Sequence, residues 1–94
     1  MGNKHNTTAI LKSIADDTRL EIIRKLAHEK CEVTSREIVS GCGTALSLSQ
    51  PTMSHHFQKL VTSDVIRERK EGTEKYYSLN IELLAAIGID VTKL

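Results

Sequence analysis

The spacing of hydrophobic residues along the chain predicts two helices near its N-terminus. From Thr8 onward, hydrophobic side chains recur at Ile10, Leu11 and Ile14, which is helical spacing. The sequence ADDT then interrupts the pattern and supplies two aspartates that can cap a following helix. In the next run, TRLEIIRKLAHEK, the hydrophobic stripe consists of Leu20, Ile23, Leu26 and Ala27. We therefore expect a first helix that ends near ADDT and a second, longer helix directly after it.

A third and a fourth helix are predicted on either side of a glycine-containing segment. The sequence SREIVSGC favours a short helix that is capped by Thr34 or Ser35 and ends at the glycines of GCG. Ser49 is a suitable N-cap for the next helix, and Pro51 falls in its first turn, where a missing N–H breaks no hydrogen bond. We predict that this fourth helix spans residues 49–63 and buries one face. That face consists of Met53, Phe57, Leu60 and Val61.

After the fourth helix the pattern becomes β-prone. The runs VIRERK and KYYSLN flank EGTE, where Gly72 suits a tight turn, and this arrangement predicts a β-hairpin over residues 65–79. Glu68 breaks the alternation, so it either lies at a solvated edge or pairs with a base on the facing strand. Asn80 can cap a last helix over residues 81–89, which is hydrophobic on nearly all sides and needs cover from more than one direction.

This order of elements matches the outline of a winged helix-turn-helix, a mainly α fold with a small β-hairpin, here with about five helices plus the wing. We expect a single domain over residues 1–94, with residues 1–7 as a loose N-terminus. Aromatic residues make up 3% of the chain, so the core must be built from aliphatic side chains, which suits small packed helices.

Charge and hydropathy limit the possible partners and locations. With a formal net charge of +1, the chain lacks the strong positive charge of a non-specific nucleic-acid binder, so any DNA binding must rest on local geometry. The N-terminus MGNKHNTTAI has no hydrophobic secretory signal, and no stretch is long and hydrophobic enough to span a membrane. We therefore expect a cytoplasmic protein that does not bind membranes and keeps its cysteines reduced.

Three segments of the sequence resemble the ArsR family of bacterial winged-helix repressors. These are ADDTRLEIIRKL, LSQPTMSHHFQKL and RKEGTEKYYSLN, in this order. The resemblance covers about residues 11–80 and implies a homodimeric repressor that binds an inverted-repeat operator in double-stranded DNA. Between Glu37 and Ser49 the chain departs from the family, because SGCGTALS is longer than the usual connection.

The polar face of the fourth helix and the hairpin supply the residues that we expect to bind DNA. Hydroxyl, amide and imidazole groups near a helix N-terminus can reach phosphates and base edges in the major groove. The resemblance implies contacts from the positions of Gln50, Ser54 and His55, and from the wing. The full set is Ser49, Gln50, Thr52, Ser54, His55 and Lys59 on the helix, with Arg69, Lys70 and Thr73 on the wing.

Some of these polar residues also have simpler interpretations. Ser49 serves equally well as a helix cap alone, and His55 could be an ordinary surface residue. His56 points toward the edge of the core, so we expect it to be a packed, hydrogen-bonded histidine.

The two adjacent histidines suggest a metal site, but the sequence argues against one. Neighbouring helical residues point about 100° apart, so His55 and His56 cannot easily chelate one ion. One metal site of the resembling family uses Cys-x-Cys in the third helix, where this chain has Thr34 and Arg36. The other needs Asp, His and Glu ligands along the last helix, and ELLAAIGID has no histidine. We expect no metal and no other cofactor.

Cys31 and Cys42 lie at opposite ends of the third-helix segment and leave two interpretations open. Free cysteines commonly act as small hydrophobic side chains. Some relatives of the fold sense oxidants or sulfur species through a cysteine pair, so the alternative is a thiol-based redox switch. The sequence does not place the two sulfurs within bonding distance.

The first and last helices predict a homodimer. A domain this small cannot cover an all-round hydrophobic helix by itself, so a second copy is expected to cover it. The expected interface residues are Ile10, Leu11, Ile14, Leu83, Leu84 and Ile87.

The leading hypothesis is therefore a sequence-specific DNA-binding repressor of ArsR type that lacks the usual metal-sensing sites. The alternative is a winged-helix module that binds a protein partner through the same polar helix, as its near-neutral charge would allow. An enzyme is not expected, because the sequence offers no nucleophile with a base, no glycine-rich phosphate loop and no carboxylate pair.

Overall fold

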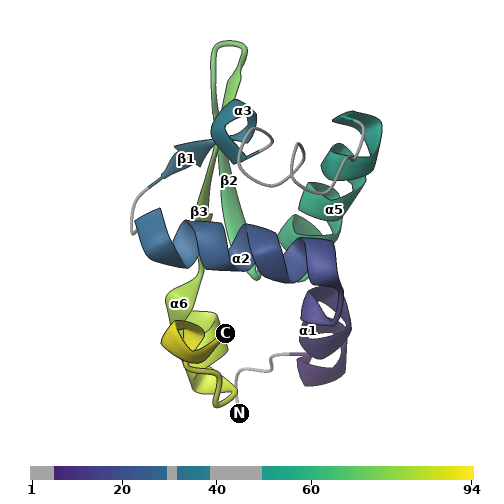
Figure 1. The fold of residues 1–94 in the computed structure, drawn as a ribbon, viewed down its shortest axis with the longest axis vertical. Helices are drawn as coiled ribbons and strands as arrows, with labels where there is room; N and C mark the ends of the chain where they lie inside the picture. The colour runs from purple at the N-terminus through teal and green to yellow at the C-terminus, as the bar shows by residue number, and fades with distance from the viewer. Residues whose placement is uncertain (1–5, 30–31, 39–49) are drawn as a thin grey trace.

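The computed structural model describes residues 6–29, 32–38 and 50–94, and Figure 1 shows how their helices surround a central one. Helix α2 (Asp17–Glu29) runs across the middle of the molecule. Helices α1 (Thr7–Ile14) and α6 (Ile81–Ala86) lie on one side of it. Helix α3, the N-terminal end of α5 and the tip of the hairpin lie on the other side. This arrangement is a winged helix-turn-helix, as the sequence predicted.

Side-chain caps explain where the first helices begin. The Asn6 Oδ1 atom accepts a hydrogen bond from a backbone N–H in the first turn of α1 (3.1 Å), and Asp16 Oδ2 accepts one from the backbone N–H of Arg19 in α2 (3.0 Å). Helix α3 (Ser35–Ile38) begins with a capping box in which Thr34 Oγ1 accepts from the N–H of Glu37 (3.2 Å). In return, Glu37 Oε1 accepts from the N–H of Thr34 (2.9 Å). Of the two predicted caps, Thr34 and Ser35, it is therefore Thr34 that caps α3.

Helix α5 (Gln50–Thr62) is close to the predicted span of residues 49–63. Its predicted hydrophobic face is confirmed: Met53, Phe57 and Leu60 are buried, and Val61 packs against the core while partly exposed. Ser49 lies outside the described residues.

The hairpin is also confirmed, and it is part of a slightly larger sheet. Strands β2 (Ile66–Glu71) and β3 (Glu74–Leu79) pair antiparallel, and Gly72 in the turn has a φ of +63°. A third strand, β1 (Val33–Thr34), pairs with β3 and gives the order β1-β3-β2. The sequence did not predict β1, because two residues are too few to show alternation.

The core surrounds α2 on more than one side. Ile23 and Leu26 from the predicted stripe are buried, but so is Ile22, which the stripe did not include. Helix α2 packs against β3, α5, α1 and η2 (Val91–Lys93), so two of its faces are covered rather than one. No helix in the described ranges is both long enough and hydrophobic enough to cross a membrane.

The end of the last helix corrects a prediction. The hydrophobic pattern suggested a helix over residues 81–89, but α6 stops at Ala86. Gly88 has a φ of +91°, its N–H donates to the Ala85 carbonyl (3.0 Å), and the next N–H, of Ile89, donates to the Leu84 carbonyl (2.8 Å). These two hydrogen bonds form a Schellman motif, which ends the helix at the glycine.

Four of the six predicted interface residues lie inside the protomer instead of on its surface. Ile10, Ile14, Leu83 and Leu84 belong to the buried core, and Ile87 is partly buried against it. Leu11 remains, with 47% of its area exposed. The prediction that Leu83 and Leu84 need a partner to cover them was therefore wrong, because α6 is already packed within its own chain.

Candidate nucleic-acid interface

One side of α5 carries exposed polar residues. Thr52, Ser54, His55 and Lys59 are exposed, and Gln50 is the first residue of the helix. These positions match the polar face that the sequence predicted, and Figure 1 shows the N-terminal end of α5 on the same side of α2 as the hairpin tip. A helix N-terminus and a β-hairpin on one side of a small domain can enter the major groove and contact the flanking backbone.

Buried aromatic contacts fix the position of α5 relative to the wing. The ring of Phe57 lies 4.8 Å from that of Tyr77 on β3, with 32° between the ring planes. The Tyr77 hydroxyl donates a hydrogen bond to Glu68 Oε2 (2.9 Å), and burial together with this carboxylate raises the pKa of Tyr77. Glu68 therefore pairs across the strands, and Lys75 Nζ lies 3.9 Å from the same carboxylate oxygen.

The two adjacent histidines occupy different environments. His56 is half-buried, and its Nδ1 lies 3.0 Å from Arg19 Nη1 and 3.7 Å from Asp16 Oδ2. Burial lowers the pKa of His56, and the charges of Arg19 and His55 lower it further, while Asp16 opposes them. The neutral ring can accept the hydrogen bond from Arg19. His56 is thus a packed histidine that ties α5 to the start of α2, and His55 is the exposed one.

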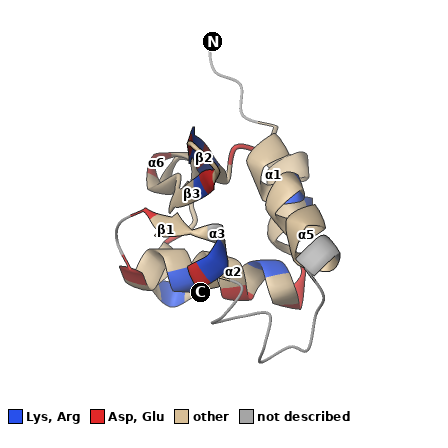
Figure 2. Ribbon diagram, turned by 90° about the horizontal axis from the view of Figure 1, so that it is seen from above, with Lys and Arg blue, Asp and Glu red and all other residues tan. Residues whose placement is uncertain are grey.

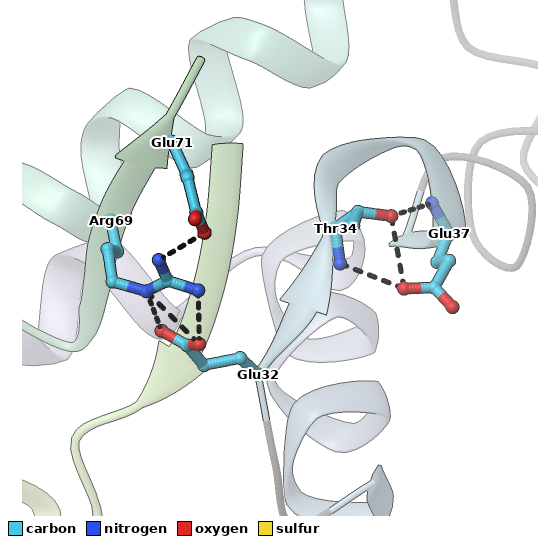
Figure 3. A network of polar contacts seen from close by, with 5 residues as sticks. All are labelled: Glu32, Thr34, Glu37, Arg69 and Glu71. Atoms are coloured by element: carbon cyan, nitrogen blue, oxygen red, sulfur yellow. Dashed lines mark hydrogen bonds and ion pairs between the residues drawn. The ribbon is translucent and has the colours of Figure 1, made fainter. Parts of the chain in front are cut away.

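On the wing, Arg69 is engaged by other residues of the protein (Figure 3). Its Nε and Nη2 bind the Glu32 carboxylate at 2.9 and 2.8 Å, and its Nη1 binds Glu71 Oε1 at 2.9 Å. The guanidinium also lies 4.5 Å from the centre of the Tyr76 ring. The hydrogen bonds with Glu32 and Glu71 raise the pKa of Arg69, and the same contacts lower that of Glu32.

This network gives Arg69 internal partners that the sequence did not predict. Three of its nitrogens are bound to two carboxylates. Arg69 thus ties the wing to the segment just before β1. Lys70 and Thr73 are exposed near the hairpin turn, and Lys70 forms no ion pair within the described ranges.

Charge is unevenly distributed over the helices (Figure 2). Helix α2 carries residues of both signs, whereas α1 and α5 are almost uncharged, with Lys12 and Lys59 as their respective charged residues. The interface side of α5 is therefore neutral to weakly basic. Such a surface favours recognition by hydrogen bonds over strong non-specific attraction to phosphates.

The residues suspected of metal or redox chemistry are only partly described. Within the described residues, no group of three or more His, Cys, Asp or Glu side chains could hold a metal ion. Cys31 and Cys42 lie outside the described residues. Thr34 and Arg36 stand at the positions where the family's thiolates are expected; Thr34 forms the capping box, and Arg36 Nη2 lies 3.8 Å from Glu74 Oε2.

Two contacts of Arg69 on the wing were missed by sequence reasoning. The Arg69–Tyr76 pair could have been found, because the hairpin register places these residues opposite each other. The partnership of Arg69 with Glu32 had no local signal, since it depends on the two-residue strand β1.

Comparison with known proteins agrees with this geometry. A family model described as a helix-turn-helix domain matches residues 14–69. The arsenical resistance operon repressor of Staphylococcus aureus is 36% identical over 78 residues, which are 82% of this chain and 68% of that protein. The structure of the transcriptional repressor PagR of Bacillus anthracis is 30% identical, with a TM-score of 0.67 over 86% of each chain.

A crystal structure of an ArsR family transcriptional regulator shares the fold at lower identity. Its TM-score is 0.75, its sequence identity is 22%, and the match covers 93% of this chain and 84% of the other. The residues matched by the helix-turn-helix family model, 14–69, include α2, α3, α5 and the first part of β2. The chain therefore belongs to the ArsR family of helix-turn-helix transcriptional regulators, which are DNA-binding proteins and not enzymes.

Proposed function

We propose that this protein is a homodimeric repressor that recognises an inverted repeat in double-stranded DNA through α5. The observation that carries this proposal is the exposed polar face of α5, held in place by Phe57, His56 and the wing. Two copies of α5 related by a two-fold axis would read half-sites about one helical turn apart, or a small multiple of it. A cytoplasmic location remains a prediction.

Base recognition is assigned to Gln50 and His55. A glutamine amide can pair with adenine through two hydrogen bonds, and an exposed imidazole can donate to or accept from a neighbouring base edge. Ser49, Thr52, Ser54 and Lys59 would then position the helix through hydroxyl and phosphate contacts. The rival interpretation, a protein partner on the same face, would require no base preference at all.

Selection of bound sequences from random duplex DNA, followed by affinity measurements on the selected operator, tests this assignment. Gln50→Ala or His55→Ala should each cost about 1–3 kcal/mol per half-site and relax the preference at one operator position. Gln58→Ala, an exposed glutamine farther along α5, is the matched control and should change neither. If both test variants kept full affinity and sequence preference, α5 would not be a DNA reader and a protein partner would become the better explanation.

The wing should contribute through Lys70 and Thr73, with Arg69 as an internal support. Lys70→Ala should weaken binding to all sequences alike and reduce the slope of log affinity against log salt by roughly one unit. Arg69→Ala should leave that slope unchanged, because its guanidinium is already bound to Glu32 and Glu71. Salt titrations of the two variants measure this difference. Equal loss of slope in both would show that Arg69 leaves its carboxylates to bind phosphate.

We also propose that the protein holds no resident metal at the family's third-helix site. The Thr34 hydroxyl is hydrogen-bonded in the capping box, and neither threonine nor arginine supplies the thiolates that the site needs. Arsenic sensing through that site, as the name of the Staphylococcus relative would suggest, is therefore not proposed. Elemental analysis of the dialysed protein should find no stoichiometric zinc, copper or nickel.

A further inference from the structure

A groove lies between α1 and α5, on the flank of the DNA-reading helix. It encloses about 490 Å³, which is within the range of small-molecule sites. Helix α1 contributes Lys12 and Ser13, and the start of α2 contributes Arg19. Helix α5 contributes His55, Lys59 and Thr62. The groove thus shares two residues with the proposed DNA-binding face.

The charges that line this groove all have the same sign. Lys12, Lys59 and Arg19 are cationic, and none of the described residues that line the groove is Asp or Glu. This contrasts with a net charge of +1 for the whole chain. Lys12 and Lys59 form no ion pair within the described part of the chain, so their ammonium groups remain available. The Asp16 carboxylate, beside Arg19, already interacts with His56 and Arg19.

Two serines that line the groove are held by internal hydrogen bonds. Ser63 Oγ donates to Ser13 Oγ (2.9 Å), which in turn donates to the Ile10 carbonyl (2.8 Å). Arg19 Nε donates to the Ser13 carbonyl, and Arg19 Nη1 lies against His56. Among the described contacts the Nη2 atom of Arg19 has no hydrogen-bond partner, so it can donate to a ligand. A guanidinium held by internal hydrogen bonds, in a groove that is also lined by Lys12 and Lys59, favours an oxyanion.

We propose that the groove binds a small free oxyanion, a phosphate or a carboxylate, and that its binding weakens the hold on DNA. The second step rests on the proposed function, because the anion would engage His55 and Lys59, which that function uses on DNA. Helix α1 lies on the far side of α2 from the hairpin tip (Figure 1). Leu11 and Ala9 of the groove wall point about 160° apart around α1.

The first test needs no DNA and uses the whole protein with inorganic phosphate and with citrate as probes. Amide NMR spectra should show saturable shifts at Lys12, Ser13 and Thr62 that sodium chloride of equal ionic strength does not produce. Lys12→Gln should raise the half-saturating concentration by roughly tenfold or more, since it removes one charge-assisted contact. Lys93→Gln, which removes the same charge from an exposed position in η2, is the control and should behave like the unmodified protein. Shifts that are absent, or unchanged in Lys12→Gln, overturn the site.

The second test measures operator affinity at constant ionic strength. Saturating phosphate should weaken operator binding of the unmodified protein and of Lys93→Gln, but not of Lys12→Gln. If Lys12→Gln itself binds the operator more weakly in chloride buffer, the groove holds a DNA phosphate and the proposal fails. If no variant binds DNA while the NMR shifts persist, the anion site stands and the proposed function fails.

Discussion

Two residues at the start of α2, Asp16 and Arg19, affect the pKa of His56 on α5. Burial favours the neutral form of His56, which accepts a hydrogen bond from Arg19, and the nearby Asp16 carboxylate opposes this effect. Arg19 holds the pKa of Asp16 below its usual value through its backbone N–H and its charge, against an opposing effect of burial. The pKa of each group is thus lowered, that of Asp16 from its ordinary value of 3.8 and that of His56 from 6.5.

The sign of the His56 contribution follows from its lowered pKa. In the unfolded chain the imidazole takes up a proton near its ordinary pKa of 6.5, whereas the folded protein resists protonation. The contribution of neutral His56 to the free energy of unfolding is fully present above pH 6.5. It is lost as the pH falls from there toward the lower pKa that His56 has in the folded protein. We expect the free energy of unfolding to decrease between about pH 7 and pH 5, and His56→Gln to reduce this slope. Urea denaturation across this range measures it, and equal slopes for both proteins would contradict the assignment.

Residue roles were predictable from sequence where they depend on direction along a helix, and not where they depend on distant partners. The 100° rotation per residue correctly separated exposed His55 from packed His56. Arg69 looked like a free cation of the wing because its partner, Glu32, is 37 residues earlier in the chain. The polar face of α5 could thus be predicted, but the internal pairing of Arg69 could not.

At the scale of elements, two helices end in the same way with different residues. Helix α5 ends with Asp64 at a φ of +65°, where the N–H of Asp64 donates to the Val61 carbonyl and that of Val65 to the Leu60 carbonyl, both at 3.0 Å. Helix α6 ends with the same pair of hydrogen bonds around Gly88. The first helix end matched the sequence prediction closely. The second did not, since Ile87 and Ile89 continue the hydrophobic pattern past the glycine that stops the helix.

The positive φ of Gly88 leads to a direct stability prediction. No atom lies within 4 Å of the position that a Cβ would occupy, so Gly88→Ala adds backbone strain without a steric clash. We expect it to lower the free energy of unfolding by about 1 kcal/mol. Asp64→Gly is the matched control and should not lower stability, because it relieves the same strain at the end of α5. Thermal or urea unfolding measures this change. If Gly88→Ala left the free energy of unfolding unchanged, the backbone at the end of α6 would be able to change conformation without cost.

For the whole molecule, the central place of α2 determines which surfaces are left for a second copy. Helices α1 and α6 both lie on the side of α2 away from the wing, where their inner residues fill the core (Figure 1). The large hydrophobic residues that remain exposed in the described structure are Leu11 on α1 and Ile81 on α6, each 47% exposed. The residues that the sequence assigned to a dimer interface lie mainly on the buried faces of these two helices, and the part of α1 and α6 in a dimer stays a prediction. Periodicity gives the hydrophobic face of a helix, and in α6 that face was already used within the protomer.

The dimer can now be tested without unfolding the protomer. Leu11→Glu places a charge on the exposed side of α1, so we expect a folded monomer with a far-UV circular dichroism spectrum like that of the unmodified dimer. It should also lose most of its affinity for an inverted repeat, because only one half-site can be engaged at a time. Leu84→Glu is the contrasting variant: its side chain is fully buried, so it should fail to fold rather than simply dissociate. Sedimentation velocity over a range of concentrations distinguishes these states. An unmodified protein that sediments as a folded monomer throughout would reject the dimer, and a Leu11→Glu protein that remains dimeric would place the interface elsewhere.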